Sequence, residues 1–533
     1  MWQNNWREQA CATLTDRKWD VIVIGGGITG AGILLEAARN GLRTLLVDQR
    51  DFAWGTSSRS SKLVHGGLRY LKEGKLLLTR DSVHERQKLL KEAAGLVEPQ
   101  SFAFADYRGR KPGRRMFELG LALYDLMAGQ RARHYFDADE FTMLAPHIAT
   151  DDLDGGLCYT DAKTDDARLV LRVLQEALAC GGTAINYMAA HRLMRRNGQV
   201  CGVELQDAAS GEMHAIEAKV VISATGAWAD AMRGAQNNGH KLRPLRGSHL
   251  VLPAWRLPVA QAVSLMHPQD GRPVFAFPWE GATLVGTTDV DHRDDMRFEA
   301  AITREEVNYL LAALAFQFPQ LAITRDDIIA TYAGVRPVID SGKADPSKEG
   351  RDHAVWLEDG LLTVTGGKLT TFRLIAQDAL LHAAPMLRGW QLDRRARPIF
   401  RPAQALAWRP QLNAFQRRRL VGRYGCYAGM LVADARAGEL EAIAGTDTLY
   451  AELRWAARME AVQHLEDLLL RRTRLGLLLR HGGTELLPKI RAICQPELKW
   501  DDARWNSELA AYLALWQQHY SVPGENAPAQ KVA

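Results

Sequence analysis

Three glycines and one aspartate near the amino terminus have the types and spacing needed to bind a dinucleotide. Gly25, Gly27 and Gly30 form the pattern G-x-G-x-x-G. The first glycine allows a tight turn, the second lets a pyrophosphate approach the backbone, and the third lets a helix pack closely on a strand. The amino end of that helix attracts the phosphate charge. Asp48 follows Gly30 by 18 residues, where a carboxylate can bind ribose hydroxyls.

The elements that must position these residues are readable around them. Residues 20–24 are a short apolar, β-branched run that predicts a buried parallel strand. A helical pattern follows over residues 33–38, and Asn40-Gly41 closes it with a residue suited to a left-handed cap. Residues 43–47 predict a second strand that ends just before Asp48. The order is that of one β-α-β unit of a Rossmann-like domain.

Two later glycine turns favour FAD over a nicotinamide dinucleotide. A predicted strand over 219–223 runs into Ala224-Thr225-Gly226, and another over 361–365 runs into Gly366-Gly367. A flavin dinucleotide buried along its whole length would contact both turns, whereas a nicotinamide cofactor would need neither. The sequence therefore predicts bound FAD.

Several cations lie in loops marked by glycine or proline. Arg69, Arg336 and Lys368 could converge on a dianionic phosphate through charge-assisted hydrogen bonds. Tyr70 and Thr288 could donate further hydrogen bonds to the same small molecule. This set predicts a small phosphorylated polyol as the substrate.

Two histidines are candidates for proton transfer, because imidazole titrates near neutral pH. His249 follows Gly247-Ser248 at the start of a predicted antiparallel strand and is the preferred base. His65 stands beside Gly66-Gly67 and is either the alternative base or a contact to the flavin.

The run from Thr56 to Tyr70, together with the glycine pattern, resembles the FAD-dependent glycerol-3-phosphate dehydrogenases of the aerobic, quinone-reducing type. The resemblance extends over roughly residues 18 to 520. Further segments that carry it are Asp165-Asp166-Ala167-Arg168-Leu169, Gly247-Ser248-His249, Gly286-Thr287-Thr288-Asp289, Tyr332-Ala333-Gly334-Val335-Arg336-Pro337, Gly366-Gly367-Lys368-Leu369-Thr370-Thr371 and Arg471-Arg472-Thr473-Arg474-Leu475-Gly476.

The resemblance implies oxidation of sn-glycerol 3-phosphate to dihydroxyacetone phosphate, with electrons passed to a membrane quinone in glycerol catabolism. His249 and Arg336 are the expected catalytic residues, and Arg69, Tyr70, Thr288, Arg336 and Lys368 the expected substrate-binding residues. The expected cofactor-binding residues are Gly25, Gly26, Gly27, Ile28, Thr29, Gly30, Asp48, Thr56, Ser57, Ser58, Ser61, Lys62, His65, Gly66, Gly67, Ala224, Thr225, Gly226, Gly366, Gly367, Lys368, Leu369 and Thr370.

The chain is long enough for several folding units. We expect an extension over 1–17, an FAD-binding domain over 18–388, and a helical domain over 389–533, where arginine and proline mark the boundary. Short strands at 249–253, 274–278 and 283–288 predict an antiparallel substrate sheet. Its residues would come from inserted segments at about 76–155 and 240–340. The fold class is α/β.

Composition and the absence of certain motifs argue against several classes of protein. The 533 residues are 47% hydrophobic and 24% charged, which excludes a disordered chain. The formal charge of +5 is too small to favour a nucleic-acid partner. No CxxC spacing predicts a metal site, and neither a signal peptide nor a spanning helix is readable.

One basic cluster predicts contact with a membrane surface. Arg108, Arg110, Lys111, Arg114 and Arg115 adjoin an apolar helical stripe that begins at Met116. Such a pattern suits an anionic lipid surface, or equally a loop before a buried helix. We expect a peripheral protein on the cytoplasmic, inner face of a bacterial membrane, with a homodimer left open.

Two other functions remain open from the sequence. An FAD-dependent amine or 2-hydroxy-acid oxidoreductase on the same fold would need only one arginine and a tyrosine, and Lys368 would be surplus. A flavin or lipid-headgroup binding module without catalysis is the second.

Overall fold

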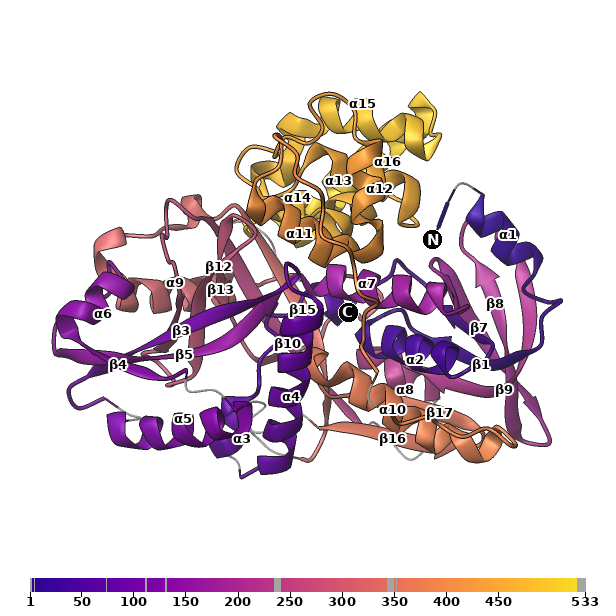
Figure 1. Ribbon diagram of the computed structural model, residues 1–533, viewed down its shortest axis with the longest axis horizontal. Helices are drawn as coiled ribbons and strands as arrows, with labels where there is room; N and C mark the ends of the chain where they lie inside the picture. Colours follow the sequence, from indigo (N-terminus) through magenta and orange to yellow (C-terminus); the bar gives the residue numbers. More distant parts are fainter. Residues whose placement is uncertain are drawn as a thin grey trace.

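The computed structural model describes residues 2–3, 5–72, 74–110, 113–129, 132–233, 241–342, 349–350, 352–395 and 397–524, without the side chains of Arg69 and Lys72. Two sheets and a helical region make up the molecule (Figure 1). A short helix, α1 (Trp6–Ala12), precedes the first sheet. Within the described residues, no helix combines the length and apolar character that crossing a membrane requires.

The first sheet is the expected Rossmann-like layer. Its strand order is β16-β17-β9-β1-β2-β6, and the hairpin β7-β8 is attached to β9. The strands from β17 to β6 are parallel, and Val21 of β1 is paired with both Thr44 and Val220. The bounds are β1 (Trp19–Ile24), β2 (Thr44–Val47), β6 (Thr183–Ile185), β7 (Met188–Arg196), β8 (Gln199–Asp207), β9 (Met213–Ser223), β16 (His353–Glu358) and β17 (Leu361–Gly366).

Three helices cover one face of this sheet. Helix α2 (Ile28–Arg39) packs between α7 (Asp166–Ala179) and α10 (Phe372–Ala383) (Figure 1). Ten of the twelve α2 residues are buried, because the helix is covered on both sides. Gly41 follows α2 with φ +83°, so the predicted left-handed end of this helix is confirmed.

The second sheet is mostly antiparallel and faces the first. Its order is β14-β10-β13-β12-β11-β3-β5-β4, with β15 also paired to β10, and only β11 and β3 run parallel. The bounds are β3 (Val97–Tyr107), β4 (His134–Asp137), β5 (Leu153–Thr164), β10 (Leu242–Pro253), β11 (Ala262–Met266), β12 (Pro273–Trp279), β13 (Ala282–Gly286), β14 (Val290–Asp291) and β15 (Ala330–Ile339).

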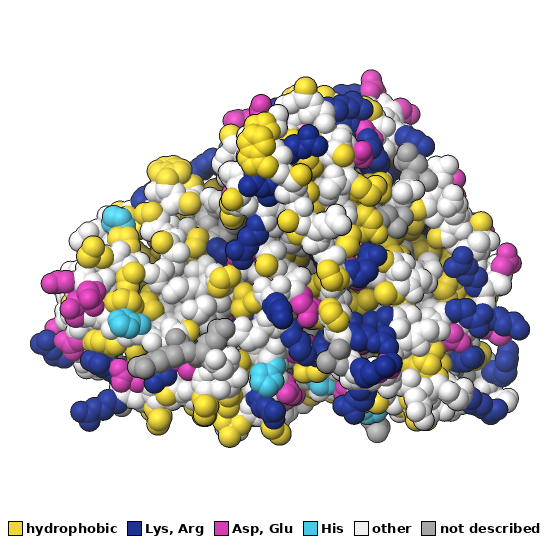
Figure 2. Space-filling model, viewed as in Figure 1, with side chains coloured by type: hydrophobic (Ala, Val, Ile, Leu, Met, Phe, Trp, Pro, Cys, Tyr) yellow, Lys and Arg dark blue, Asp and Glu magenta, His cyan; other side chains and the backbone are white. Residues whose placement is uncertain are grey.

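Helices at the lower edge of Figure 1 border this sheet. They are α3 (Leu68–Lys72), α4 (Leu76–Glu92) and α5 (Arg114–Ala128). Two other helices, α6 (Ala138–Leu144) and α9 (Arg304–Gln317), pack elsewhere on the sheet. The short helix α8 (Ala229–Arg233) follows β9 of the first sheet. Apolar side chains gather along the same lower edge in Figure 2. From α4 and α5 they include Leu77, Leu119 and Leu126, each more than 70% exposed.

The carboxyl-terminal region is helical and lies above both sheets (Figure 1). Its helices are α11 (Ala414–Tyr424), α12 (Ala428–Asp434), α13 (Tyr450–Met459), α14 (Leu475–Leu478), α15 (Leu487–Leu498) and α16 (Asp502–His519). Residues 452–480 contain few helix-breaking residues, but they do not form one helix. Backbone at Ala461 and Arg474 has φ of +53° and +64°, and a π-helical turn occupies Asp467–Arg472. In this region several arginines point inward, toward Asp51 in the loop after β2 and toward Asp165 and Asp166 at the start of α7.

Candidate active site

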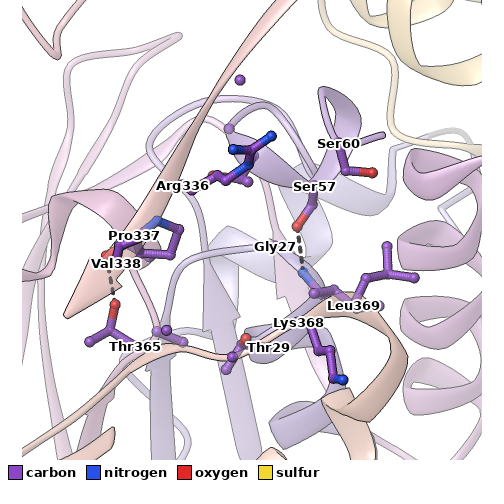
Figure 3. Close-up of a pocket in the computed structure, with 18 of the residues that line it drawn as sticks. Gly27, Thr29, Ser57, Ser60, Arg336, Pro337, Val338, Thr365, Lys368 and Leu369 are labelled. Carbon is purple, nitrogen blue, oxygen red and sulfur yellow. Dashed lines mark hydrogen bonds between the residues drawn. The ribbon is translucent and has the colours of Figure 1, made fainter. Parts of the chain in front are cut away.

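A cavity of about 1120 Å³ lies where the carboxyl ends of β1, β9 and β17 face the second sheet. Open α/β sheets bind ligands at this edge, where the strand order reverses. Ile24, Ala224 and Thr365 line it from the first sheet, and His249 and Arg336 from the second. Figure 3 shows side chains from both sides pointing into it.

The turn formed by residues 25–30, which we name the glycine turn, has no room for side chains at its glycines. A Cβ atom on Gly30 would lie 1.9 Å from the carbonyl oxygen of Gly25, and Gly25 itself has φ +113°. A Cβ on Gly27 would meet Oγ of Ser57 at 3.1 Å. The amino end of α2 therefore closes directly onto β1, and its first turn faces the cavity. This backbone fits a pyrophosphate, as the pattern predicts.

Asp48 supports the same turn from the end of β2. Its Oδ2 accepts a hydrogen bond of 2.6 Å from the backbone N–H of Gly26, and its Oδ1 accepts one of 2.8 Å from Arg50. Burial raises the pKa of Asp48 to about 7, against the effect of these two bonds. Asp48 also lines the cavity, where it can meet ribose hydroxyls.

The loop after β2 connects the glycine turn to the second sheet. Oγ of Ser57 accepts a hydrogen bond of 3.0 Å from the backbone N–H of Ile28, the contact drawn in Figure 3. The hydroxyl of Thr56 donates a hydrogen bond of 2.5 Å to the carbonyl oxygen of Val335 in β15. One short 3₁₀ turn, Thr56–Ser58, thus holds the two sides of the cavity together.

The two later glycine turns close the rest of the wall. Thr365 donates a hydrogen bond of 3.0 Å to the carbonyl of Gly226, which joins the turn after β17 to the turn after β9. Thr370 donates to the carbonyl of His65 at 3.2 Å. Other predicted cofactor residues that line the cavity are Thr29, Ser61, Gly67, Thr225, Gly366, Gly367 and Leu369.

His249 is buried and in contact with a hydroxyl group. Its Nε2 lies 2.9 Å from Oγ of Ser61, its ring stacks on Tyr332 at 4.6 Å, and Nδ1 has no hydrogen-bond partner in the described part of the chain. Burial, and then the charges of Arg336 and Lys62, lower its pKa well below the usual value. The imidazole is therefore uncharged at neutral pH, and one of its ring nitrogens carries a lone pair.

Two guanidinium groups converge on Asp289. Arg336 donates to Oδ1 of Asp289 at 2.8 Å and to Oγ1 of Thr287 at 3.0 Å. Arg272 donates two hydrogen bonds, of 3.0 and 2.9 Å, to the backbone carbonyl of the same Asp289, and it also lines the cavity. Sequence reasoning missed Arg272, although Gly271 and Pro273 flank it in the way that marked the other arginines.

Lys368 faces a different part of the cavity. Its Nζ lies 4.3 Å from the centre of the Tyr70 ring and has no hydrogen-bond partner among the described residues. Burial lowers the pKa of Lys368 to about 7, while the charge of Asp161 opposes the shift. In Figure 3, Lys368 and Arg336 lie on opposite sides of the Ser57 contact, so the two cations do not meet at one point.

Some predicted site residues do not line the cavity. Lys62 is fully buried in an ion pair of 2.9 Å with Asp166 instead. Thr288 donates to Glu306 at 2.6 Å and accepts from the backbone of Ser248 at 2.9 Å, so its hydroxyl is already bonded within the protein. Gly26, Gly30, Ser58 and Gly66 lie behind the wall and support it, and the side chain of Arg69 falls outside the described residues.

Strand β7 supplies a part of the wall that no sequence motif indicated. His191, Arg192 and Arg195 line the cavity from this strand, beside Asp359 from the turn between β16 and β17. Arg195 and Asp359 form an ion pair of 3.7 Å. Because β7 has no glycine pattern, only the pairing of β7 with β8, and of β8 with β9, brings these side chains to the cofactor cavity.

Two family models match the chain in order. Residues 20–377 match the FAD dependent oxidoreductase family, and residues 395–505 match the C-terminal domain of alpha-glycerophosphate oxidase. Aerobic glycerol-3-phosphate dehydrogenases of Staphylococcus aureus strains are 38% identical over 379 residues, which are 70% of this chain and 68% of theirs.

Solved structures share the architecture. The FAD complex of a glycerol-3-phosphate dehydrogenase from Bacillus halodurans superimposes with a TM-score of 0.76 at 27% identity, covering 97% of this chain and 98% of that one. The L-alpha-glycerophosphate oxidase of Mycoplasma pneumoniae shares the fold, with a TM-score of 0.57 at 17% identity, over 74% of this chain and all of that one. The chain therefore belongs to the FAD-dependent oxidoreductase family, among the aerobic glycerol-3-phosphate dehydrogenases.

Proposed function

We propose that this protein oxidises sn-glycerol 3-phosphate to dihydroxyacetone phosphate and passes the electrons to a membrane quinone. The observation that carries the proposal is the neutral His249 beside Arg336 in the cofactor cavity. The names of the relatives agree with this substrate. The role in glycerol catabolism follows from the same reaction.

The cavity wall fits FAD. The glycine turn and Ser57 would hold the pyrophosphate, Asp48 the ribose, and the turns at 224–226 and 366–370 the flavin end. When bound, FAD supplies the acceptor for a hydride, and the protein supplies geometry and charge.

His249 is the residue we assign to proton abstraction. In the tautomer whose Nε2–H donates to Ser61, Nδ1 carries the lone pair and has no hydrogen-bond partner among the described residues, and we assign to it the proton of the substrate C2 hydroxyl. As this O–H bond breaks, C2 loses its hydrogen as a hydride and the C–O bond becomes a carbonyl. Arg336 stabilises the negative charge that develops on the oxygen. The proton on His249 then passes to solvent.

We assign Lys368 and Tyr70 to the phosphate, with Arg69 as a further predicted contact. An unpartnered ammonium group in a buried wall is poised for an anion, because each charge-assisted bond to phosphate is stronger than a neutral one. Arg336 and Arg272 lie at the His249 side, where the substrate hydroxyl must sit. A substrate with an anion at one end and a secondary alcohol at the other would use both groups of side chains.

Anaerobic titration of the purified yellow protein tests the substrate. Glycerol 3-phosphate is expected to bleach the flavin absorbance, while glycerol, glycine and a 2-hydroxy acid are not. Bleaching by an amine or a 2-hydroxy acid instead would favour the other oxidoreductases, and no bleaching by any of them would favour a binding module. Glycine oxidase of Geobacillus kaustophilus shares only the fold, with a TM-score of 0.51 at 18% identity.

The lower edge of the molecule supports a peripheral position on the inner face of a bacterial membrane. This edge carries exposed apolar side chains from α4 and α5, and we name it the apolar edge. They are Leu76, Leu77, Met116, Leu119, Leu123 and Leu126. On the opposite face of α5, Leu121 and Tyr124 are buried, so the helix is amphipathic and anchored to the protein. Exposed Arg114 and Arg115 lie at the start of α5 and can meet anionic lipid, whereas Lys111 falls outside the described residues. A quinone in the bilayer would be within reach of this edge, and a homodimer remains a further proposal.

A further inference from the structure

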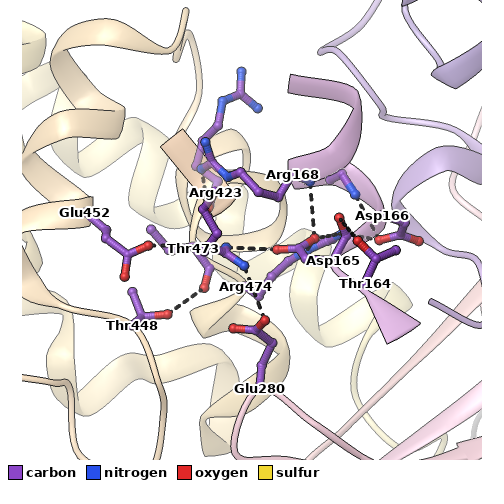
Figure 4. Close-up of polar contacts among 12 residues, drawn as sticks. Thr164, Asp165, Asp166, Arg168, Glu280, Arg423, Thr448, Glu452, Thr473 and Arg474 are labelled. Atoms are coloured by element: carbon purple, nitrogen blue, oxygen red, sulfur yellow. Dashed lines mark hydrogen bonds and ion pairs between the residues drawn. The ribbon is translucent and has the colours of Figure 1, made fainter. Parts of the chain in front are cut away.

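The carboxyl-terminal helical region reaches the back of the cofactor cavity through buried ion pairs. Arg471, Arg472 and Arg474 are at most 1% exposed, and none is among the residues that line the cavity. Their partners include Asp51, in the loop after β2, and Asp165 and Asp166, at the start of α7. Figure 4 shows the part of this cluster around Arg474.

The acids hold one segment of the chain, residues 51–62, which we name the cavity loop. Trp54, Gly55, Thr56, Ser57, Arg59, Ser60 and Ser61 of this loop line the cavity. The front of the loop thus faces the cofactor space, and its back faces the carboxyl-terminal arginines.

The first ion pair fixes the start of the cavity loop. Arg472 donates to both carboxylate oxygens of Asp51, at 2.6 and 2.8 Å, and Nε of Arg471 donates to the same carboxylate at 2.6 Å. Two residues later, the backbone N–H of Ala53 donates to the carbonyl of Gly26 at 3.0 Å. Asp51 therefore ties the loop to the arginines close to where the loop binds the glycine turn.

The second ion pair fixes the remainder of the loop. Nε of Arg474 donates to Asp165 at 2.9 Å, Nη1 donates to the carbonyl of Ser58 at 3.2 Å, and Nη2 pairs with Asp166. Asp166 in turn accepts hydrogen bonds from the backbone N–H and the hydroxyl of Ser60, at 3.0 and 2.7 Å. Arg474 thus contacts the loop directly at Ser58 and indirectly at Ser60.

Asp51 and Asp165 of this cluster are ionised. Burial by itself would raise the pKa of Asp51, but the charges of Arg472 and Arg471 lower it to about 2. The pKa of Asp165 is lowered in the same way by Arg474 and Arg423, against the effect of burial. Buried charges of this kind are costly when one partner is removed, and their geometry is correspondingly fixed.

We propose that the carboxyl-terminal region is part of the FAD site, in which Arg472 and Arg474 are positioning residues that hold the cavity loop against the glycine turn. The loop carries Ser57, whose Oγ accepts the N–H of Ile28 at the start of α2. If the arginines release the loop, the wall beside the pyrophosphate opens and FAD dissociates more easily. This inference concerns retention of the cofactor and does not depend on the substrate.

The full-length variant Arg474→Lys tests the proposal. Lysine keeps the positive charge beside Asp165 and Asp166, but one ammonium group cannot also reach the carbonyl of Ser58 in the geometry of the guanidinium. Arg454→Lys is the matched control, because Arg454 is also buried and pairs with Glu439 and Glu497, entirely within the carboxyl-terminal region.

We expect Arg474→Lys to raise the dissociation constant of FAD by about 10- to 100-fold, the range that the loss of one or two charge-assisted bonds gives. Release of FAD is measured by flavin fluorescence, below the unfolding temperature of each variant. Hydrogen exchange of residues 51–62 in the holoenzyme should become faster in the same variant. The control should match the wild type in both measurements.

The variant Arg472→Lys tests the other end of the loop, through Asp51, and should have the same two effects. If Arg474→Lys does not fold, Arg472→Lys alone tests the proposal. Wild-type FAD affinity in either folded arginine variant would overturn the proposal, as would an equal loss in Arg454→Lys. If neither arginine variant folds while the control does, the cluster stabilises the whole fold and the proposal is also wrong.

Discussion

Oγ of Ser61 lies 2.9 Å from Nε2 of His249, at the junction between the cavity loop and the second sheet. Ser61 belongs to the segment that contacts the glycine turn, whereas His249 belongs to β10. The contact leaves Nδ1 of His249 as the nitrogen without a hydrogen-bond partner in the described part of the chain. The base of the proposed reaction is therefore oriented by the same loop that lines the cofactor space.

Replacement of His249 by asparagine is expected to lower the rate of flavin reduction by glycerol 3-phosphate by about 10²- to 10⁴-fold, the usual contribution of a general base. The FAD content should not change. Stopped-flow absorbance under anaerobic conditions measures the rate. Ser61→Ala should cost less than about tenfold, because it removes only the orienting contact. A wild-type rate in the asparagine variant would assign the base to another residue.

The pH dependence of the same step follows from the environment of His249. Burial, with Arg336 and Lys62, holds its pKa well below 6.5, so the neutral, proton-accepting form persists through neutral pH. The rate of flavin reduction should therefore stay constant on lowering the pH from 8 to about 6.5. It should fall only at lower pH, as the imidazole becomes protonated. A rate that halves near pH 6.5 or above would contradict this environment.

Lys368 predicts a different pH effect, on the KM. Since its pKa is about 7, the amine loses its charge as the pH rises above 7, and attraction for the phosphate weakens. The KM for glycerol 3-phosphate should rise over that range. Lys368→Met should raise the KM by about 10- to 150-fold, the equivalent of about 1.5–3 kcal/mol, and should remove this pH dependence. A KM that still rises above pH 7 in the variant would place the titrating group elsewhere.

Arg272→Lys tests the contact that sequence reasoning missed. The planar guanidinium donates two hydrogen bonds to the carbonyl of Asp289, and an ammonium group cannot reproduce both. Because Asp289 also holds Arg336, we expect kcat to fall about tenfold, in line with the loss of about 1.4 kcal/mol. Arg297→Lys is a suitable control, since Arg297 is exposed and its side chain pairs, among the described residues, only with Asp295 two residues away. Equal effects of the two changes would argue against a role for Arg272 in the site.

The glycine turn gives a prediction about cofactor binding. A methyl group on Gly30 would lie 1.9 Å from the carbonyl oxygen of Gly25, so Gly30→Ala must push α2 away from β1. We expect purified protein with less than a tenth of the wild-type flavin content, since overpacking costs about 1–3 kcal/mol or more. Gly429→Ala is the matched control, because a Cβ there would meet no described atom from outside its own helix within 4 Å, and alanine favours the helix. Full flavin content in Gly30→Ala would contradict the geometry of the turn.

The sequence predicted the parts of the fold that rest on local patterns. Short runs of apolar residues that end at glycines predict several elements in the right places. These are the first β-α-β unit, the strands before Gly226 and Gly366, and the antiparallel second sheet. His249, Arg336 and Lys368 line one cavity because each lies next to such a boundary. These signals depend on a few adjacent residues, so one sequence is enough to read them.

Other features depend on partners far away in the chain. Lys62 belongs to a serine-rich run typical of a cofactor loop, but Asp166, 104 residues later, pairs with it in the interior. Residues 452–480 contain few helix-breaking residues, yet the backbone at Arg474 has φ +64° and its side chain meets Asp165, 309 residues earlier. Ion pairs between residues far apart in the chain leave no periodic pattern in the sequence. The positions of Lys62 and Arg474 could therefore not be predicted from the sequence alone.

The apolar edge gives the last prediction, on membrane binding. Leu119 and Leu126 are 73% and 78% exposed on α5, so replacing both by serine should leave the fold intact. Each leucine that enters a bilayer contributes about 1.5–3 kcal/mol, and the double change should weaken binding to anionic liposomes by at least about 100-fold. This loss should persist at high salt, because burial of apolar surface is not screened.

Reversing the charges of Arg108, Arg114 and Arg115 provides the contrasting measurement. Their attraction to anionic lipid is screened within about 8–10 Å at ordinary ionic strength, so the charge variant should bind weakly at low salt and differ little from wild type at high salt. Met143→Ser is the control, since Met143 is 85% exposed on α6, outside this edge. Both edge variants should slow reduction of quinone in liposomes and keep wild-type activity with a water-soluble dye. If liposome binding were unchanged in both, the membrane contact would have to lie on another surface, and the electrons would need a route to quinone that does not pass the apolar edge.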